Sequence, residues 1–192
     1  MRPQSLLARV FPLAALAVAA ACDGDGGTNP RPRLTPADIQ GVYKVCSLRF
    51  TPIQTALPPA NLLQFVVHPS PPAPKQAPSL TLSGQTPTYQ LLYTRRSDNF
   101  TQDLRGNVAL GVDEIILSIP DEASNEVRRE LLLPGQMLLH FSRTPRQLTS
   151  VGEVGYNVRR ADYARAAGIT EEGLQERING SLTGVFAADA CP

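Results

Sequence analysis

The sequence predicts an all-β domain, namely an antiparallel up-and-down barrel of about eight strands with a short helix before the last strand. First, apolar and polar residues alternate with a period of two, most clearly over residues 100–110. Second, turn residues such as Pro120-Asp121 and Pro134-Gly135 separate the apolar segments at short intervals and leave no room for crossover helices. Third, 18 Pro and 14 Gly among 192 residues favour turns over long helices.

The first strand is expected at residues 41–50. Its apolar residues fall on two phases, with Tyr43 and Val45 on one side and Cys46, Leu48 and Phe50 on the other. Because successive side chains of a strand point to opposite faces, this change of phase predicts a bend or a β-bulge within the strand.

The rest of the domain alternates strands with turns. Residues 51–79 contain eight prolines and are expected to form a long loop, with a short strand at 62–67, that lies as a lid over the barrel mouth. The other strands are predicted at residues 80–83, 88–96, 100–110, 114–119, 127–133, 136–142, 148–158 and 181–188. Helical turns are expected at residues 161–167, ended by Gly168, and a second short helix is expected between Thr170 and Gly180.

About eight antiparallel strands with one apolar face must either close into a barrel or double over into two sheets. An open sheet would leave its edges and its apolar face exposed. The barrel is the preferred prediction and a two-sheet β-sandwich is the runner-up. The interior of an eight-stranded barrel is just wide enough to be filled by side chains or to hold one small ligand.

This order of strand, long loop, meander, helix and last strand resembles that of the lipocalins. Lipocalins begin with Gly-x-Trp on the first strand, and Gly41-Val42-Tyr43 stands at that place here, although the chain contains no Trp. The resemblance implies an apolar ligand pocket inside the barrel. Its candidate lining residues, on the apolar or aromatic phase of their strands, are Tyr43, Tyr89, Tyr93, Phe100, Leu104, Phe141 and Tyr156. Plain core packing is the alternative explanation for each of them.

Residues 1–21 predict an export signal peptide, because a short basic start precedes an apolar run too short to span a bilayer. The following segment, Val18-Ala19-Ala20-Ala21-Cys22, resembles the lipobox of bacterial lipoproteins, in which the Cys is acylated and becomes the N-terminus. The resemblance implies a lipid anchor at Cys22 and a place in the bacterial cell envelope, on the periplasmic face of a membrane. An ordinary secreted protein cleaved after Ala21 is the alternative. Residues 22–36 are expected to be a disordered tether and residues 37–192 a single barrel domain.

With Cys22 acylated, Cys46 and Cys191 are the remaining cysteines of the chain. In an oxidising compartment they are expected to form a disulfide that fastens the first strand to the end of the domain. Two buried free thiols are the alternative.

Charge and composition argue against several functions. The chain from Cys22 onward lacks Arg2 and Arg9 and keeps 16 basic and 17 acidic residues, with the arginines scattered among acids, so nucleic acid is not an expected partner. Only His68, in the proline-rich loop, and His140, expected to face solvent, are present. Two histidines and no free thiol give neither a His-rich metal site nor a Cys-His pair, so we expect no cofactor, no metal and no enzymatic activity.

The sequence therefore predicts a membrane-anchored binding protein that holds a small apolar or amphipathic molecule inside the barrel. Arg49 or Arg95 is expected to meet a polar head group at the barrel mouth. The alternative is a structural or protein-interaction lipoprotein whose barrel is filled by side chains. A continuous cavity lined by the candidate aromatic residues favours the first prediction, and a packed interior with an exposed apolar patch favours the second.

Overall fold

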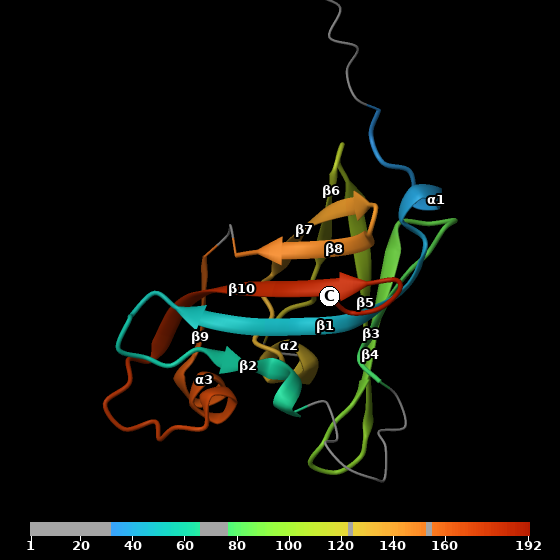
Figure 1. The fold of residues 1–192 in the computed structure, drawn as a ribbon. Coiled ribbons are helices and arrows are strands. Elements are labelled where there is room, and N and C mark those ends of the chain that lie inside the picture. The colour runs from blue at the N-terminus through green and yellow to red at the C-terminus, as the bar shows by residue number, and fades with distance from the viewer. Residues whose placement is uncertain (1–31, 66–76, 123–124, 153–154) are drawn as a thin grey trace, which may run out of the picture. The chain divides into compact units, whose positions relative to one another are not determined.

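The computed structural model describes residues 32–65, 77–122, 125–152 and 155–192, and it contains a closed antiparallel β-barrel (Figure 1). Eight strands form the barrel: β1 (Gly41–Pro52), β3 (Ser79–Leu82), β4 (Thr88–Thr94), β5 (Thr101–Leu110), β6 (Glu114–Ser118), β7 (Gln136–Arg143), β8 (Arg146–Val151) and β10 (Arg177–Ala187). Strand β1 pairs with both β3 and β10 and thereby closes the sheet on itself. The predicted up-and-down barrel is confirmed, and the β-sandwich is excluded.

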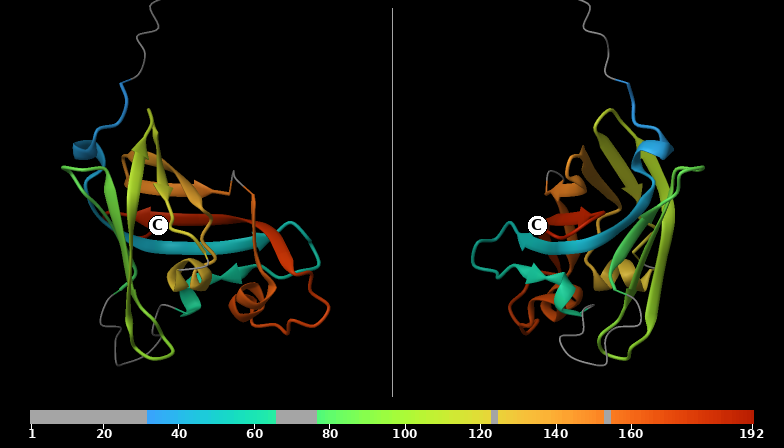
Figure 2. Two further views of the ribbon diagram at one scale, coloured as in Figure 1. Left: turned by 180° about the vertical axis from the view of Figure 1, so that it is seen from behind. Right: turned by 45° about the vertical axis from the view of Figure 1, so that its right-hand side comes forward.

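Short elements cover both ends of this barrel. They are α1 (Pro36–Ile39), β2 (Ala60–Asn61), the 3-10 helix η1 (Leu62–Phe65), α2 (Glu126–Glu130), β9 (Tyr156–Arg159) and α3 (Arg160–Ala167). Helix α1 lies at one end, beside the tight turns that join β3 to β4, β5 to β6 and β7 to β8. Helices α2, α3 and η1 lie at the opposite end (Figures 1 and 2). We refer to these as the α1 end and the α2 end.

Strand β1 contains the irregularity that its two apolar phases predict. The register between β1 and β10 shifts between Val45 and Ser47, so that residues on both sides of the shift turn into the core. Cys46 lies at the shift and forms a disulfide with Cys191, as predicted. The first strand and the end of the chain are therefore joined by both a ladder and a covalent bond.

The ordered domain begins earlier than the predicted boundary at residue 37. Leu34 is buried, and its N–H donates a hydrogen bond to the Gly111 carbonyl oxygen at 2.8 Å. Thr35 then caps α1, because its N–H and its hydroxyl both donate to the Asp38 carboxylate. The last residues assigned to the tether are thus part of the domain, whereas residues 1–31, with the predicted signal peptide and Cys22, lie outside the described residues.

Four local predictions are corrected. Residues 127–133 were predicted as a strand, but α2 occupies this region because Asn125 caps it by accepting a hydrogen bond from the Arg128 N–H. Residues 171–176 form turns rather than a second helix, since Gly173 has a φ of 77° and β10 already begins at Arg177.

The other two corrections concern strand lengths. The strand predicted at 148–158 is interrupted at Gly152, where φ is 77°, and divides into β8, which is in the barrel, and β9, which pairs only with an extension of β10. The short strand predicted at 62–67 is the 3-10 helix η1 over its described residues. By contrast, the helix predicted at 161–167 is confirmed as α3, and Gly168 ends it with a φ of 69°.

Candidate functional site

The barrel interior is the place where the predicted ligand-lining residues were expected to meet. Five of them, Tyr43, Tyr89, Tyr93, Leu104 and Phe141, are buried in the core. Tyr156 lies at the edge of the core, where its ring meets that of Phe50 edge-on at 5.6 Å and its hydroxyl donates to the Leu132 carbonyl. Phe100 is 58% exposed, because it precedes β5 at the barrel rim, and its ring lies 6.0 Å from the Arg95 guanidinium carbon. The expectation that Phe100 lies on the inner face of its strand is therefore wrong.

The space left inside the barrel is small. A void of about 20 Å³ remains, lined only by apolar groups and by the rings of Tyr89 and Tyr93, and Leu63, Leu131 and Leu133 close it at the α2 end. An apolar void of this size has no hydrogen-bond partners for a water molecule, and a drug-sized ligand needs roughly 300–1,000 Å³. Burial raises the pKa of Tyr89 to about 12, so its phenol stays neutral in the core. In this conformation the interior is packed core.

A much larger hollow lies outside the barrel, at the α2 end. It is a cleft of about 900 Å³ between η1, the turn from β4 to β5, α2 and α3. The lining residues are mostly charged: Gln64, Arg95, Arg96, Ser97, Glu126, Arg129, Glu130, Asp162, Arg165 and Gly168. We define these ten residues as the arginine cleft. Of the predicted head-group residues, Arg95 belongs to it, whereas Arg49 lies exposed on β1, opposite β2 and β10.

The turn between β4 and β5 positions one wall of the cleft. The Arg95 N–H donates to the Phe100 carbonyl at 2.8 Å, and the Asn99 N–H donates back to the Arg95 carbonyl at 3.0 Å. Asn99 has a φ of 62°, a left-handed conformation that Asn tolerates better than most residues. The turn therefore holds Arg95 at the end of the barrel and places Arg96 and Ser97 on the rim.

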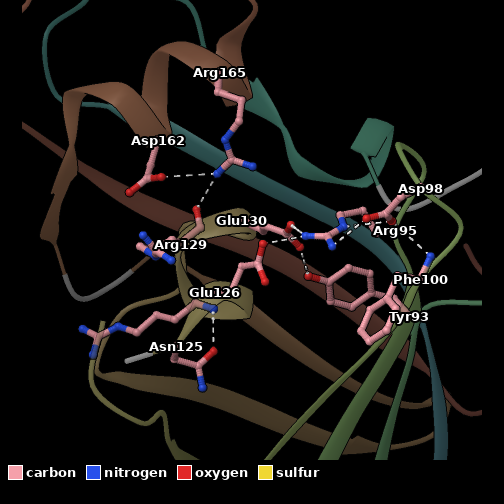
Figure 3. Close-up of polar contacts among 11 residues, drawn as sticks. Tyr93, Arg95, Asp98, Phe100, Asn125, Glu126, Arg129, Glu130, Asp162 and Arg165 are labelled. Carbon is pink, nitrogen blue, oxygen red and sulfur yellow. Dashed lines mark hydrogen bonds and ion pairs between the residues drawn. The ribbon is translucent and has the colours of Figure 1, made fainter. Parts of the chain in front are cut away.

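Arg95 is the centre of a charge network that fastens α2 to the barrel (Figure 3). Its guanidinium contacts the carboxylates of Glu126 and Glu130, each at 2.6 Å, and that of Asp98 at 2.7 Å. Hydrogen bonds from Arg95 hold the pKa values of Asp98 and Glu126 below their usual range. The Tyr93 hydroxyl donates to Glu130 at 2.5 Å, and burial, followed by this carboxylate, raises the pKa of Tyr93. The network thus joins three carboxylates, of which Glu130 is the most buried, to a single guanidinium and a phenol.

Helix α2 ends in a strained turn. Leu132, directly after the helix C-cap, has a φ of 46°, although glycine usually fills this position because a β-carbon is disfavoured there. The Leu133 N–H closes the turn by donating to the Arg128 carbonyl at 2.9 Å. Leu132 is fully buried, so its packing offsets the backbone strain. The turn directs Leu131 and Leu133 toward the barrel interior and leaves the charged face of α2 in the cleft.

Helix α3 forms the opposite wall. The Arg165 guanidinium donates to the Arg129 carbonyl at 3.0 Å and lies 3.4 Å from the Asp162 carboxylate (Figure 3). Burial raises the pKa of Asp162, and Arg165 partly offsets this effect. Gln64 of η1 then bridges the two walls, because its carbonyl accepts from Arg96 at 3.1 Å and its side-chain amide donates to Ala166 at 2.9 Å.

The other titratable residues singled out from the sequence lie elsewhere. His140 Nδ1 is 3.4 Å from a Glu114 carboxylate oxygen across β6 and β7, and its side chain is partly exposed. His68 lies outside the described residues. Within the described ranges, no three His, Cys, Asp or Glu side chains come together in a way that could hold a metal ion.

Comparison with known proteins gives no relative. No protein-family model matches the chain, and neither curated proteins nor solved structures include a match. Among the described helices, none is both long enough and apolar enough to cross a lipid bilayer. Functional inference therefore depends on the geometry of the arginine cleft and of the packed barrel.

Proposed function

We propose that this chain is a lipid-anchored binding protein of the bacterial cell envelope, in which the barrel is a filled scaffold and the arginine cleft holds the ligand. The supporting observation is the contrast in free volume, about 20 Å³ inside the barrel and about 900 Å³ in the cleft. A binding site for a small molecule is usually a concave, largely preformed hollow of several hundred Å³. The proposal keeps the membrane-anchored binding protein predicted from the sequence and moves the binding site from the interior to the α2 end.

The position of the chain's entry into the domain fits this proposal. Leu34 and α1 enter at the α1 end, so an anchor at Cys22 would hold the domain by the end opposite to the cleft. Residues 22–33 span at most ~40 Å when extended. A tether of this reach leaves the cleft accessible to molecules of the surrounding compartment.

The test is native mass spectrometry of the full-length protein, extracted in a mild detergent and incubated with an envelope extract. We expect a bound mass that is lost on denaturation. The variant Ser97→Trp, which places a large ring in the cleft rim, should lose the bound mass. Thr51→Trp is the matched control, because Thr51 is exposed on β1 and does not line the cleft.

Three results would contradict the proposal. A wild-type protein that remains without ligand after incubation would remove the binding role and favour a structural lipoprotein. A bound mass retained in Ser97→Trp would return the ligand to the barrel interior. An unchanged membrane fraction in a Cys22→Ala variant would remove the lipid anchor but leave the binding site standing.

A further inference from the structure

The charged groups of the arginine cleft are unequally paired. Glu126 and Glu130 both contact Arg95, and Asp162 contacts Arg165, so each carboxylate of the cleft has a guanidinium partner. Within the part of the chain that the structure describes, Arg96 and Arg129 have no carboxylate within ion-pair distance. The unpaired charges of the cleft are therefore positive.

One nitrogen of the Arg129 guanidinium also lacks a hydrogen-bond partner in the described part of the chain. Its Nε is buried and, among the described residues, has no hydrogen-bond acceptor. Most buried polar groups in proteins have a partner, so the described residues satisfy the Arg129 guanidinium less completely than is usual. Arg96 makes one hydrogen bond to the Gln64 carbonyl and is otherwise exposed on the rim. Guanidinium groups bind carboxylates and phosphates with two parallel hydrogen bonds, which suits both positions.

The floor of the cleft limits where an anion can bind. Glu126 is 55% exposed in its side chain and lies beside Arg95, whose guanidinium already contacts three carboxylates. An anion placed over Arg95 would meet the like charge of Glu126. Anionic groups of a ligand are therefore expected to bind at the two sides of the cleft, one at Arg96 and the other at Arg129 with Arg165.

We infer, as an extension of the proposed binding function, that the arginine cleft binds a small molecule with at least two anionic groups, phosphates or carboxylates. Arg96 holds one group, and Arg129 with Arg165 holds the other. Among the described residues, the side chains that line the cleft are charged or polar, which argues against a purely apolar ligand. Each carboxylate of the described lining has a guanidinium partner, which argues against a cation. The volume of about 900 Å³ has room for both anionic groups and the scaffold between them.

The experiment is isothermal titration calorimetry of the full-length protein in detergent, with citrate and with tripolyphosphate as ligands, at two salt concentrations. We expect saturable binding that weakens as salt increases. Arg96→Gln and Arg129→Gln should each weaken binding about ten-fold or more, since each removes a charge-assisted contact. Glu126→Gln should strengthen binding, because it removes the like charge from the floor. Arg105→Gln is the matched control, since it deletes one exposed guanidinium paired with Asp103 on β5, outside the cleft.

A parallel arm separates a soluble anion from a lipid head group. Vesicles of phosphatidylcholine with and without phosphatidylglycerol are added to the protein, and the same variants are compared by co-sedimentation. Binding to the anionic vesicles that depends on Arg96 and Arg129 assigns the anionic groups to lipid, and citrate binding without vesicle binding assigns them to a soluble molecule.

Three results would overturn the inference. One is the absence of binding to every probe. Another is binding that Arg105→Gln weakens as much as Arg96→Gln, which would show only general electrostatic attraction. Third, if an extract-derived ligand is lost in Ser97→Trp but kept in Arg96→Gln and Arg129→Gln, the cleft is a binding site for a different chemistry, and the proposed function stands without this inference.

Discussion

At each end of the barrel an arginine fastens a short helix to the rim, but the two arginines contact different kinds of groups. At the α1 end, Arg146 holds α1 by donating to the backbone carbonyls of Asp38 and Gln40, and Arg143 pairs with the Asp38 carboxylate at 3.1 Å. At the α2 end, Arg95 holds α2 through carboxylates alone. Each end thus consists of a short helix that an arginine fastens to the rim.

The two ends differ in the charge and pairing of the groups around each helix. The contacts of Arg146 are mostly neutral carbonyls, and the disulfide at Cys46 adds a covalent tie on this half of β1. The α2 end instead keeps half-buried ion pairs, a strained Leu132 and unpaired guanidinium groups. Buried ion pairs contribute little net stability, because the cost of desolvation offsets their attraction. The comparison supports the proposal that the α1 end mainly stabilises the fold and the α2 end holds the ligand.

The largest expected effect concerns the covalent tie. The Cys46→Ala/Cys191→Ala variant should have a free energy of unfolding lower by ~4–5 kcal/mol, because the bridge closes a loop across 145 residues of sequence. Urea denaturation measures this difference. Reductant should lower the wild type to the level of the variant and leave the variant unchanged. Anion affinity should persist in the folded variant, and its loss would show that the two ends are coupled.

The second effect concerns the arginines that hold the two helices. Arg95→Ala should lower the free energy of unfolding by about 3 kcal/mol, because it leaves the buried Glu130 carboxylate without its guanidinium. Arg146→Ala should have a smaller effect of about 1–2 kcal/mol, since its acceptors are largely neutral. Arg105→Ala, on an exposed pair, should stay below about 1 kcal/mol. Equal losses for Arg95 and Arg146, measured by urea denaturation, would remove the distinction between the two ends.

The third effect compares one hydroxyl at each end. Tyr93→Phe removes a donor to the buried Glu130 carboxylate and should lower the free energy of unfolding by about 1.5–3 kcal/mol. Tyr43→Phe removes a hydroxyl that donates to the neutral Ile39 carbonyl and accepts a long hydrogen bond from Arg146 at 3.3 Å, and about 1–1.5 kcal/mol is expected. Thermal unfolding of both variants with the wild type gives the order. A larger loss for Tyr43→Phe would mean that the charge at Glu130 adds nothing to its hydrogen bond.

Much of this fold could be predicted from local patterns in the sequence. Neighbouring residues alone predict strand β5 from its alternation, the irregularity in β1 from the change of phase around Cys46, and the end of α3 from Gly168. Helix α2 was not predicted, because residues 131–133 are three leucines in a row and the helix depends on the Asn125 side chain accepting from the Arg128 N–H, which a pattern of apolar residues does not show. Sequence alternation also shows which face of a strand is buried without showing whether side chains fill the space behind it.

The arginine cleft could not be predicted for a different reason. Gln64, Arg96, Arg129 and Arg165 come from four separate segments, and only the register of the barrel and the lengths of its connections bring them to one end. In the sequence, the arginine pairs at 95–96 and 128–129 look like scattered charges. The anion site is inferred from which of these arginines lack a carboxylate partner, and that depends on which carboxylates the fold places beside them.

The smallest expected effect concerns the α1 end, where Thr35 and Asp38 form the capping box of α1. Hydrogen bonds from the Thr35 hydroxyl and N–H, and then from Arg143, lower the pKa of Asp38 to about 2. A folded pKa below the unfolded value of 3.8 means that this stabilisation is present above about pH 4 and is lost as the pH falls from about 4 to 2. Asp38→Asn should therefore lower the urea midpoint slightly at pH 7, with the difference from wild type shrinking toward pH 2. Because Asp38 lies at the end opposite to the arginine cleft, citrate affinity at pH 7 should be unchanged, and a change would show that α1 and the cleft respond to each other.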